Sequence, residues 1–332
     1  METEAEEPRG ALEEALYEIK RVIVGQDAML ERLMVALLAG GHVLLEGVPG
    51  LAKTLTVKTL ADVLGGSFSR VQFTPDLVPS DLVGTRIYRP DTGRFDVELG
   101  PVFGNFLLAD EINRAPAKVQ SALLEVMQEA QVTIGGTSFP MPEPFLVLVT
   151  QNPIESEGTY PLPEAQVDRF LMKILVDYPS TGEEAAIVGR AIGGLPTAEE
   201  RLALDDLMRY RQDASKVFVD RTVVAFAVEL ADATRRPRLY GADDVEGLVD
   251  YGASPRGPIG LVQSAQALAL LRGRRYTLAA DVRDVAGDVL RHRLVLSYDA
   301  LSDGVSPDDV LERIFAVVES PAEVAPPDEL AA

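Results

Sequence analysis

The chain of 332 residues contains, at positions 42–54, the stretch His42-Val43-Leu44-Leu45-Glu46-Gly47-Val48-Pro49-Gly50-Leu51-Ala52-Lys53-Thr54. Its first five residues are an apolar run that predicts a buried strand, and the residues from Lys53 to Leu64 have the pattern of a helix. A glycine-rich turn that joins a buried strand to a helix is the context in which a phosphate-binding loop forms. We therefore predict such a loop at positions 47–54.

The chemistry of this loop predicts binding of a nucleoside triphosphate together with Mg²⁺. Backbone N–H groups of such a loop point at the phosphates, and the first turn of the helix adds partial positive charge. Lys53 supplies a full positive charge, and the hydroxyl of Thr54 is a ligand for Mg²⁺. The residues that we expect to bind the nucleotide are Gly47, Val48, Pro49, Gly50, Leu51, Ala52, Lys53, Thr54 and Leu55.

One position departs from the strict pattern Gly-x-x-x-x-Gly-Lys-[Ser/Thr], because Ala52 stands where the second glycine is usual. A methyl group is tolerated there if the residue has a negative φ, and on that condition the match loses little specificity. The alternative interpretation of the stretch is an ordinary glycine-rich turn before a helix.

A second apolar run, Asn105–Ala109, ends in the carboxylates of Asp110 and Glu111. A Mg²⁺-dependent hydrolase needs such a pair, since the first acid holds the metal through its water shell and the second polarises the attacking water. Surface carboxylates at the end of a strand are the alternative. The phosphate-binding loop earlier in the chain favours the catalytic interpretation.

A third apolar run, Phe145–Thr150, ends in Gln151-Asn152-Pro153. Polar residues at the carboxyl ends of strands in an open α/β sheet converge on the ligand. The side chain of Asn152 is therefore predicted to bond the γ-phosphate or the attacking water. A plain Asn-Pro turn is the alternative interpretation.

The first half of the chain alternates short apolar runs with helical patterns, which indicates an α/β fold, a P-loop αβα arrangement around a parallel sheet. Further strands are expected at Phe68–Phe73 and Met172–Leu175, and further helices at Ala28–Leu38 and Ala117–Ala130. Residues 179–182 are typical of a linker, and a smaller all-α lid domain with periodic apolar positions follows. The expected divisions are a flexible acidic N-terminus over residues 1–10, the nucleotide-binding domain over 11–178, the helical domain over 183–318 and a flexible tail over 319–332.

Charge and composition count against several classes of protein. The formal net charge is −21, from 52 acidic against 31 basic residues, and such a surface repels a phosphate backbone, so nucleic acid is disfavoured as a partner. The chain has no cysteine and hence no disulfide framework, and its apolar runs are shorter than a membrane span. No segment has the form of a secretion signal, so a cytoplasmic protein is expected. The two histidines, His42 and His292, are expected to serve packing.

These motifs and their order resemble the AAA+ ATPases, and more closely their MoxR family. The resemblance extends from about Val22 to Pro258. The stretches that carry it are Val24-Gly25-Gln26, Gly47–Thr54, Phe73-Thr74-Pro75-Asp76-Leu77-Val78-Pro79-Ser80-Asp81, Ala109-Asp110-Glu111-Ile112-Asn113-Arg114, Gln151-Asn152-Pro153 and Leu162-Pro163-Glu164-Ala165-Gln166-Val167-Asp168-Arg169-Phe170.

The resemblance implies a role for each matching residue. Lys53 and Thr54 correspond to Walker A, Asp110 and Glu111 to Walker B, and Asn152 to sensor 1. Arg169 corresponds to the arginine finger that reaches a neighbouring subunit's nucleotide, Arg256 to sensor 2, and Val24 and Gly25 to the adenine pocket. The resemblance also implies a homo-oligomer, a hexameric ring, with a chaperone-like activity. Family members often act beside partners that carry von Willebrand factor A domains.

An arginine supplied across a subunit interface has a clear physical use in such a reaction. Cleavage of the γ-phosphate spreads negative charge over equatorial oxygens, and a trans arginine accelerates it by about 10³- to 10⁵-fold. The alternative for Arg169 is an ion pair with Asp168 or Glu164 on the surface of a helix. The alternative for Arg256 is a structural role near the start of a helix.

Two hairpins are predicted as insertions in the α/β domain. The first comprises Thr85–Arg89 and Arg94–Val97, and the second comprises Gln131–Ile134 and Thr137–Phe139. In AAA+ proteins of similar pattern these are the helix-2 insert and the pre-sensor-1 hairpin, which project toward a central pore and could contact a client. The alternative is that both are solvent-facing decorations.

Three functions are compatible with these motifs. The first is an ATP-driven protein remodeller, the second is a nucleic-acid motor or nucleotide-dependent restriction subunit, and the third is a nucleotide-switched scaffold without turnover. The acidic charge and the lack of a basic-aromatic module count against the second. The acid Glu111 counts against the third, because a scaffold has no need of a base that polarises water. We therefore predict an ATPase.

Overall fold

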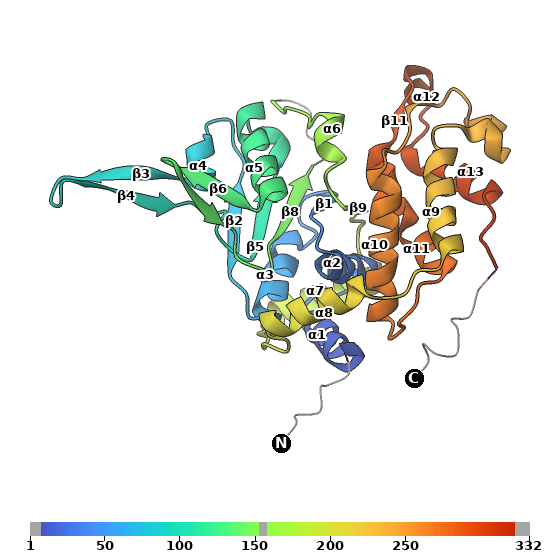
Figure 1. Cartoon of the computed structure of the whole chain (residues 1–332). Helices are drawn as coiled ribbons and strands as arrows, with labels where there is room; N and C mark the ends of the chain where they lie inside the picture. The colour runs from blue at the N-terminus through green and yellow to red at the C-terminus, as the bar shows by residue number, and fades with distance from the viewer. Residues whose placement is uncertain (1–7, 153–157, 323–332) are drawn as a thin grey trace.

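The protein is described here by a computed structural model that covers residues 8–152 and 158–322. The predictions made for residues 1–7, 153–157 and 323–332 lie outside the described residues. A five-stranded parallel sheet forms the centre of the first half, with the strand order β2-β5-β8-β1-β9 (Figure 1). Its strands are β1 (Val43–Glu46), β2 (Phe68–Gln72), β5 (Phe106–Asp110), β8 (Leu146–Gln151) and β9 (Met172–Leu175).

Helices cover both faces of this sheet because its strand residues alternate between two apolar clusters. The helices are α1 (Pro8–Val22), α2 (Asp27–Ala39), α3 (Lys53–Val63), α4 (Pro79–Val83) and α5 (Ala117–Glu129), followed by the short α6 (Glu164–Val167). Val43 and Leu45 of β1 join the cluster beneath α1–α3, whereas Leu44 joins the cluster beneath α4 and α5. Strands buried on both faces are continuous apolar runs in the sequence, as these are.

The strands of the central sheet and the helices expected in this half agree with the structure to within one residue at each end. Two segments differ from the expectation. Helix α1 begins at Pro8, so residues 8–10 are helical although they were assigned to a flexible terminus. Thr181 and Gly182, expected in a linker, form the start of α7 (Thr181–Gly193), because the hydroxyl of Ser180 caps that helix.

Both predicted hairpins are present. The first is formed by β3 (Gly84–Arg89) and β4 (Arg94–Leu99), and it projects far from the body of the molecule (Figure 1). The second is formed by β6 (Gln131–Ile134) and β7 (Thr137–Pro140). On the first hairpin the rings of Tyr88 and Phe95 lie 5.2 Å apart.

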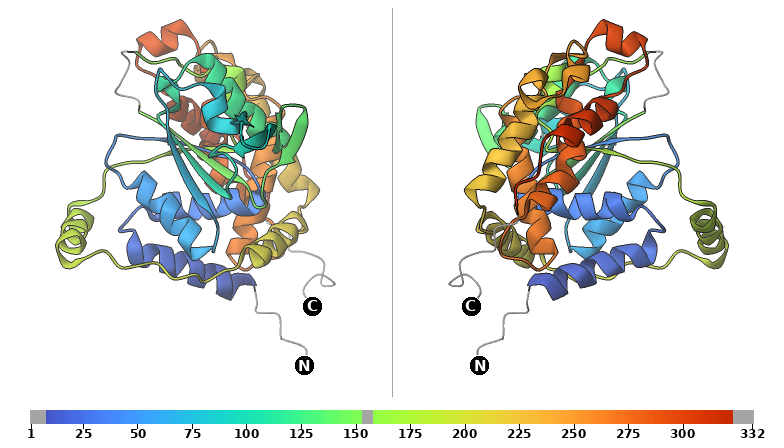
Figure 2. Two further views of the ribbon diagram at one scale, coloured as in Figure 1. Left: turned by 90° about the vertical axis from the view of Figure 1, so that its left-hand side faces the viewer. Right: turned by 90° about the vertical axis from the view of Figure 1, so that its right-hand side faces the viewer.

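The second half is helical, as predicted, and it adds one small antiparallel ribbon. Helix α7 stands apart from the other helices at one side of the molecule (Figure 2). The remaining elements are α8 (Leu204–Ser215), α9 (Arg221–Ala233), η2 (Pro237–Tyr240), η3 (Asp243–Val245), β10 (Val249–Tyr251), α10 (Arg256–Leu271), α11 (Ala279–Leu290), η4 (Arg291–Arg293), β11 (Val295–Leu296), α12 (Tyr298–Ser302) and α13 (Pro307–Val317). Strands β10 and β11 form the ribbon.

The helical half shares its apolar core with the nucleotide-binding half. One cluster includes Leu33 of α2, Ile174 of β9, Phe226 of α9 and Leu268 of α10. Sequence periodicity predicted the helices but gave no indication that their core would merge with that of the first half. The lid helices α10 and α11 are therefore anchored to α2 and β9 by buried apolar contacts.

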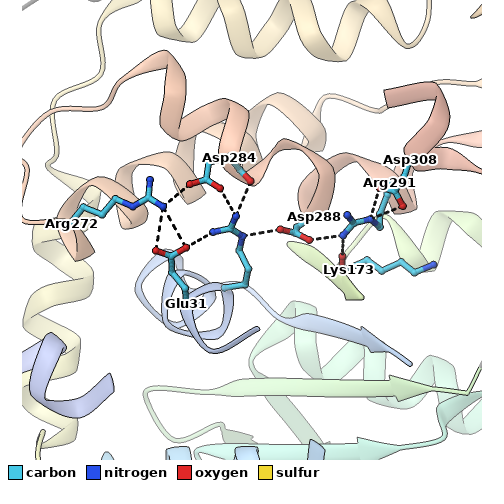
Figure 3. Close-up of polar contacts among 8 residues, drawn as sticks. Glu31, Lys173, Arg272, Asp284, Asp288, Arg291 and Asp308 are labelled. Atoms are coloured by element: carbon cyan, nitrogen blue, oxygen red, sulfur yellow. Dashed lines mark hydrogen bonds and ion pairs between the residues drawn. The ribbon is translucent and has the colours of Figure 1, made fainter. Parts of the chain in front are cut away.

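A network of ion pairs lies across the same junction (Figure 3). Arg32 of α2 donates to Asp288 at 2.8 Å and to Asp284 at 2.7 Å, both on α11. Arg291, next after α11, donates to Asp288 at 2.5 Å and to the carbonyl oxygen of Lys173 on β9 at 2.7 Å. These bonds satisfy charges that are largely removed from water, and they fix α11 to the edge of the sheet.

His42 holds the amino end of β1 against β8 and α5. Its Nδ1 accepts a hydrogen bond from the backbone N–H of Val147 at 3.1 Å, so Nε2 carries the proton and donates to the carbonyl oxygen of Met127 at 3.1 Å. Burial lowers the pKa of His42 to about 4. Burial also lowers the pKa of His292 well below its usual value, and its Nε2 bonds the carbonyl oxygen of Phe170 at 3.0 Å. Both rings are therefore neutral structural groups near neutral pH.

These two histidines should make the protein sensitive to mild acid. Below a pH of about 6.5 the unfolded chain protonates its histidines while the folded chain does not, so stability falls with decreasing pH until the folded pKa of about 4 is reached. Each histidine contributes at most about 1.4 kcal/mol per pH unit. Urea unfolding between pH 7 and 4.5 should show that a His42→Gln variant loses stability less steeply than the wild type, because glutamine can make both bonds without titrating. An identical slope in the two proteins would contradict this account of His42.

In residues 8–152 and 158–322, no helix has both the length and the apolar character that crossing a bilayer requires.

Candidate functional site

The loop between β1 and α3 has the geometry of a phosphate cradle. Gly50 has a φ of +90°, a conformation that glycine adopts without strain. A Cβ atom at Gly47 would lie 2.5 Å from the carbonyl oxygen of Val176, so only glycine fits where the chain leaves β1. Helix α3 begins at Lys53, which places its N-terminus and unpaired N–H groups at the end of this loop.

Ala52 does not meet the condition under which its methyl group would be tolerated without strain. Its φ is +55°, in the left-handed region. A residue with a Cβ atom pays about 1–2 kcal/mol for this conformation, which explains why glycine is usual at the position. The surrounding loop and the first turn of α3 must therefore hold Ala52 in a strained state.

The Lys53 ammonium is held inside the loop that it is expected to serve. It donates to the carbonyl oxygen of Gly47 at 2.5 Å. Burial lowers the pKa of Lys53, while the carboxylates of Asp110, Glu46 and Glu111 act in the opposite direction. A partly desolvated cation beside backbone N–H groups is a suitable partner for a polyphosphate.

A cleft of about 440 Å³ brings the three predicted motifs together. The loop after β1, the acids after β5 and the polar residues after β8 all line it, because parallel strands place their carboxyl ends at one edge of the sheet. The residues that line the cleft are Gly47, Pro49, Gly50, Leu51, Ala52, Lys53, Thr54, Leu55, Arg70, Gln72, Asp110, Glu111, Thr150, Gln151 and Asn152. Of the predicted loop residues, Val48 alone does not line it.

The two acids are held by different partners. The hydroxyl of Thr150 donates to Oδ1 of Asp110 at 2.5 Å and accepts from the backbone N–H of Glu111 at 2.9 Å. Glu111 has a φ of +56°, so the backbone is in a left-handed conformation where its carboxylate enters the cleft. Such strain is concentrated at functional sites, where the surrounding fold maintains it. Asn152 follows β8 directly and is buried at the wall of the same cleft.

Strand β2 adds two cleft residues that sequence reasoning missed. Arg70 donates to Oδ2 of Asp110 from Nη2 at 2.6 Å and from Nε at 3.2 Å. Gln72 donates from Nε2 to Oε2 of Glu111 at 2.8 Å, and Arg70 also bonds Gln72 at 2.9 Å. The only sequence signal was the polar residues that alternate in the strand Phe68–Gln72, and that pattern does not reveal their neighbours.

The oxygen ligands of the cleft fit a divalent metal bound with a nucleotide. Thr54 and Asp110 both line it, and hydroxyl and carboxylate oxygens are the ligands that Mg²⁺ prefers. The cleft is large enough to contain a triphosphate beside them, and Lys53 lines it as well. The residues present therefore fit the nucleotide and the metal that the motifs predicted.

A smaller apolar pocket of about 100 Å³ adjoins the loop. Val24 lines it together with Leu55 and Ile187, and the pocket shares Gly50, Leu51 and Ala52 with the large cleft. Gly25 lies beside it with a φ of +68°, and a Cβ atom there would lie 2.5 Å from the carboxylate of Glu183. An apolar pocket that opens beside a phosphate cradle is suited to a flat base such as adenine.

Arg169 and Arg256 lie together, and neither lines the cleft. Both line a pocket of about 240 Å³ next to His42 and Leu171, which precede β1 and β9. That pocket is at the amino ends of the strands, while the cleft is at their carboxyl ends. The length of the strands, about 13 Å for four residues, therefore separates the two arginines from the nucleotide site of their own chain.

Asp168 connects this pair of arginines to the lid. Its carboxylate accepts from the Ser254 hydroxyl at 2.9 and 3.0 Å, pairs with Arg256 at 3.4 Å and pairs with Arg293 at 3.1 Å. Arg293 is buried, with a side chain 3% exposed, and burial lowers its pKa to about 10 despite the opposing charge of Asp168. Within residues 8–152 and 158–322, no ion pair joins Arg169 to Asp168 or Glu164, so the surface ion pair considered for Arg169 is not formed.

Comparisons with known proteins identify the family of the chain. The model of the "ATPase family associated with various cellular activities (AAA)" matches residues 42–172, and that of the "AAA lid domain" matches residues 242–314. The chain is 58% identical over 318 residues to "Chaperone MoxR1" of Mycobacterium tuberculosis, covering 96% of this chain and 84% of that protein. It is also 34% identical to "Protein MoxR" of Methylorubrum extorquens, covering 92% and 93% of the two chains.

The chain belongs to the MoxR family of AAA+ ATPases. A crystal structure from Cytophaga hutchinsonii, described as that of a candidate ATPase, is 47% identical with a TM-score of 0.90, covering 95% of this chain and 96% of that one. This MoxR-type protein is therefore an ATPase with an α/β AAA+ core and a helical lid, as the sequence predicted. The same family relationship indicates nucleotide binding with a divalent metal, assembly into oligomers and interaction with a client.

Proposed function

We propose that this MoxR protein hydrolyses Mg²⁺-ATP at the interface between two copies of itself in a hexameric ring, and that it uses the energy to remodel or activate a client protein. The observation that carries the proposal is the placement of the arginines. Arg169 and Arg256 share one edge of the sheet while the loop, Asp110 and Glu111 share the opposite edge. A head-to-tail assembly would bring the two half-sites together, and such heterologous contacts close into rings.

The assigned roles follow from the chemistry of the groups in the cleft. Gly47–Leu55 would bind the phosphates, Thr54 and Asp110 would hold Mg²⁺, and Val24 and Gly25 would border the base. The metal neutralises charge on the phosphate oxygens when it is bound. Glu111 would accept a hydrogen bond from the attacking water, and Asn152 would orient that water or the γ-phosphate. Arg169 and Arg256 of the adjacent copy would stabilise the charge that develops on the γ-phosphate.

We infer the kind of client from the proteins that this chain resembles. The relative from Mycobacterium tuberculosis is named a chaperone, which supports remodelling of proteins as the purpose of hydrolysis. We propose a client or partner that carries a von Willebrand factor A domain, and action in the cytoplasm. The acidic charge and the family relationship give no support to a nucleic-acid motor, and the base Glu111 gives none to a scaffold without turnover.

The proposal is tested by measuring ATP turnover per subunit over a wide range of protein concentration, with the molar mass determined by light scattering. We expect turnover per subunit to rise as monomers assemble, because Arg169 and Arg256 of an isolated chain lie at the edge of the sheet opposite to its own cleft. Constant turnover below the assembly threshold would contradict a shared site. Adding candidate partner proteins or duplex DNA to the same assay distinguishes a protein remodeller from a nucleic-acid motor, since only the true partner should stimulate turnover.

A further inference from the structure

The carboxylate of Asp110 already has a cationic partner in its own chain. Arg70 approaches Oδ2 with two nitrogen atoms, while Thr150 donates to Oδ1. Both oxygens of Asp110 are thus occupied by donors from neighbouring strands. The Asp110 side chain is 17% exposed and that of Arg70 is 46% exposed, so this charge pair lies at the mouth of the cleft and partly out of water.

The Arg70 guanidinium and a divalent metal ion cannot both bind Oδ2 of Asp110 without weakening each other's interaction. A hydrogen bond between a guanidinium and a carboxylate is among the stronger pairings in proteins because donor and acceptor are both charged, and here both nitrogens reach the same oxygen. A divalent cation that approached Oδ2 would meet the positive charge of Arg70 within a few ångströms and would have to displace it. Glu111 also has an arginine partner, Arg114 at 3.1 Å, and it accepts a further bond from the neutral amide of Gln72.

We propose that Arg70 is a positioning residue that acts as the internal counter-ion of Asp110 and competes with the divalent cation for it. The site then has a low affinity for a free divalent cation, and it binds a metal that arrives already bound to nucleotide phosphates. The phosphates supply both additional ligands for the metal and an alternative partner for the released guanidinium, because Arg70 lines the same cleft. This inference rests on the assignment of Asp110 to the metal under the proposed function.

The competition is measured with Mn²⁺ alone, without nucleotide, by the paramagnetic resonance signal of the free ion and the relaxation of water protons. We expect Arg70→Ala to bind Mn²⁺ about three- to tenfold more tightly than the wild type, since a partly exposed ion pair of this kind opposes the metal by roughly that factor. The double variant Arg70→Ala/Asp110→Asn should lose the gain. These readouts do not depend on hydrolysis.

Arg114→Ala is the matched control, because it removes one positive charge next to the other acid, Glu111. An equal gain in the Arg114 variant would show a general effect of charge and would overturn the proposal. Unchanged or weaker Mn²⁺ binding by Arg70→Ala would also overturn it, since Arg70 would then not compete for Asp110. If Mn²⁺ binding in all variants is insensitive to Asp110→Asn, the assignment of Asp110 to the metal fails instead, and with it that part of the proposed function.

Discussion

Replacing Arg169 with alanine is expected to lower ATP turnover of the assembled protein by about 10³- to 10⁵-fold, the range that a trans arginine contributes to γ-phosphate cleavage. Binding of ATP by the same subunit should be unaffected, because Arg169 does not line the cleft of its own chain. Steady-state phosphate release and binding of a fluorescent ATP analogue measure the two quantities. Arg275→Ala, which changes an exposed arginine beyond the far end of α10, is the matched control and should leave both unchanged.

Mixing two inactive variants shows on which subunit Arg169 acts. Lys53→Ala subunits lack the phosphate lysine but retain Arg169, and Arg169→Ala subunits retain an intact cleft. Mixed assemblies should recover part of the wild-type turnover, since some intact clefts then face an intact arginine. If assemblies that are shown by mass to contain both variants recover no turnover, then Arg169 does not act on the neighbouring subunit.

Replacing Glu111 with glutamine is the second change with a large expected effect. We expect turnover to fall by about 10²- to 10⁴-fold, the usual contribution of a group that accepts a proton from the attacking water. Glutamine preserves the size of the side chain and can still bond Gln72, so nucleotide affinity should change little. Phosphate release under single-turnover conditions, with ATP binding measured separately, distinguishes the two effects.

Glu129→Gln serves as the control for this change, since Glu129 is an exposed carboxylate at the end of α5, away from the cleft. Unchanged turnover in the Glu111 variant would exclude it as the base. Loss of ATP binding together with turnover would instead indicate that the carboxylate shapes the cleft. The Lys53→Ala variant is the reference for this second outcome, because we expect that substitution to abolish nucleotide binding.

The parallel sheet and its carboxyl edge could be predicted from the sequence. Each strand is a continuous apolar run that is buried on both faces, and polar side chains follow directly after β1, β5 and β8. In a parallel sheet these ends must lie at one edge, so Lys53, Asp110 and Asn152 had to converge. The position of these three residues therefore depended only on local pattern and on a general rule of topology.

Two features of the cleft could not be predicted from local sequence pattern and the topology of the sheet. The φ of Ala52 is positive, and nothing in the sequence around Ala52 distinguishes this conformation from one with a negative φ. Arg70 was one polar residue in a strand of mixed polarity, and its bond to Asp110 exists only because β2 pairs with β5 in a particular register. Register depends on contacts between distant segments, which a single sequence does not display.

The sequence by itself determined the family, the phosphate loop and the acids of this protein, because each is encoded in a short, contiguous motif. The tertiary structure alone decided that Arg169 and Arg256 are neighbours at the edge opposite to the cleft, and that Asp168 and Arg293 hold that edge to the lid. The physical reason is that the helical half packs into the same apolar core as the sheet. Its long-range packing, and no local pattern, brings together side chains that are far apart along the chain.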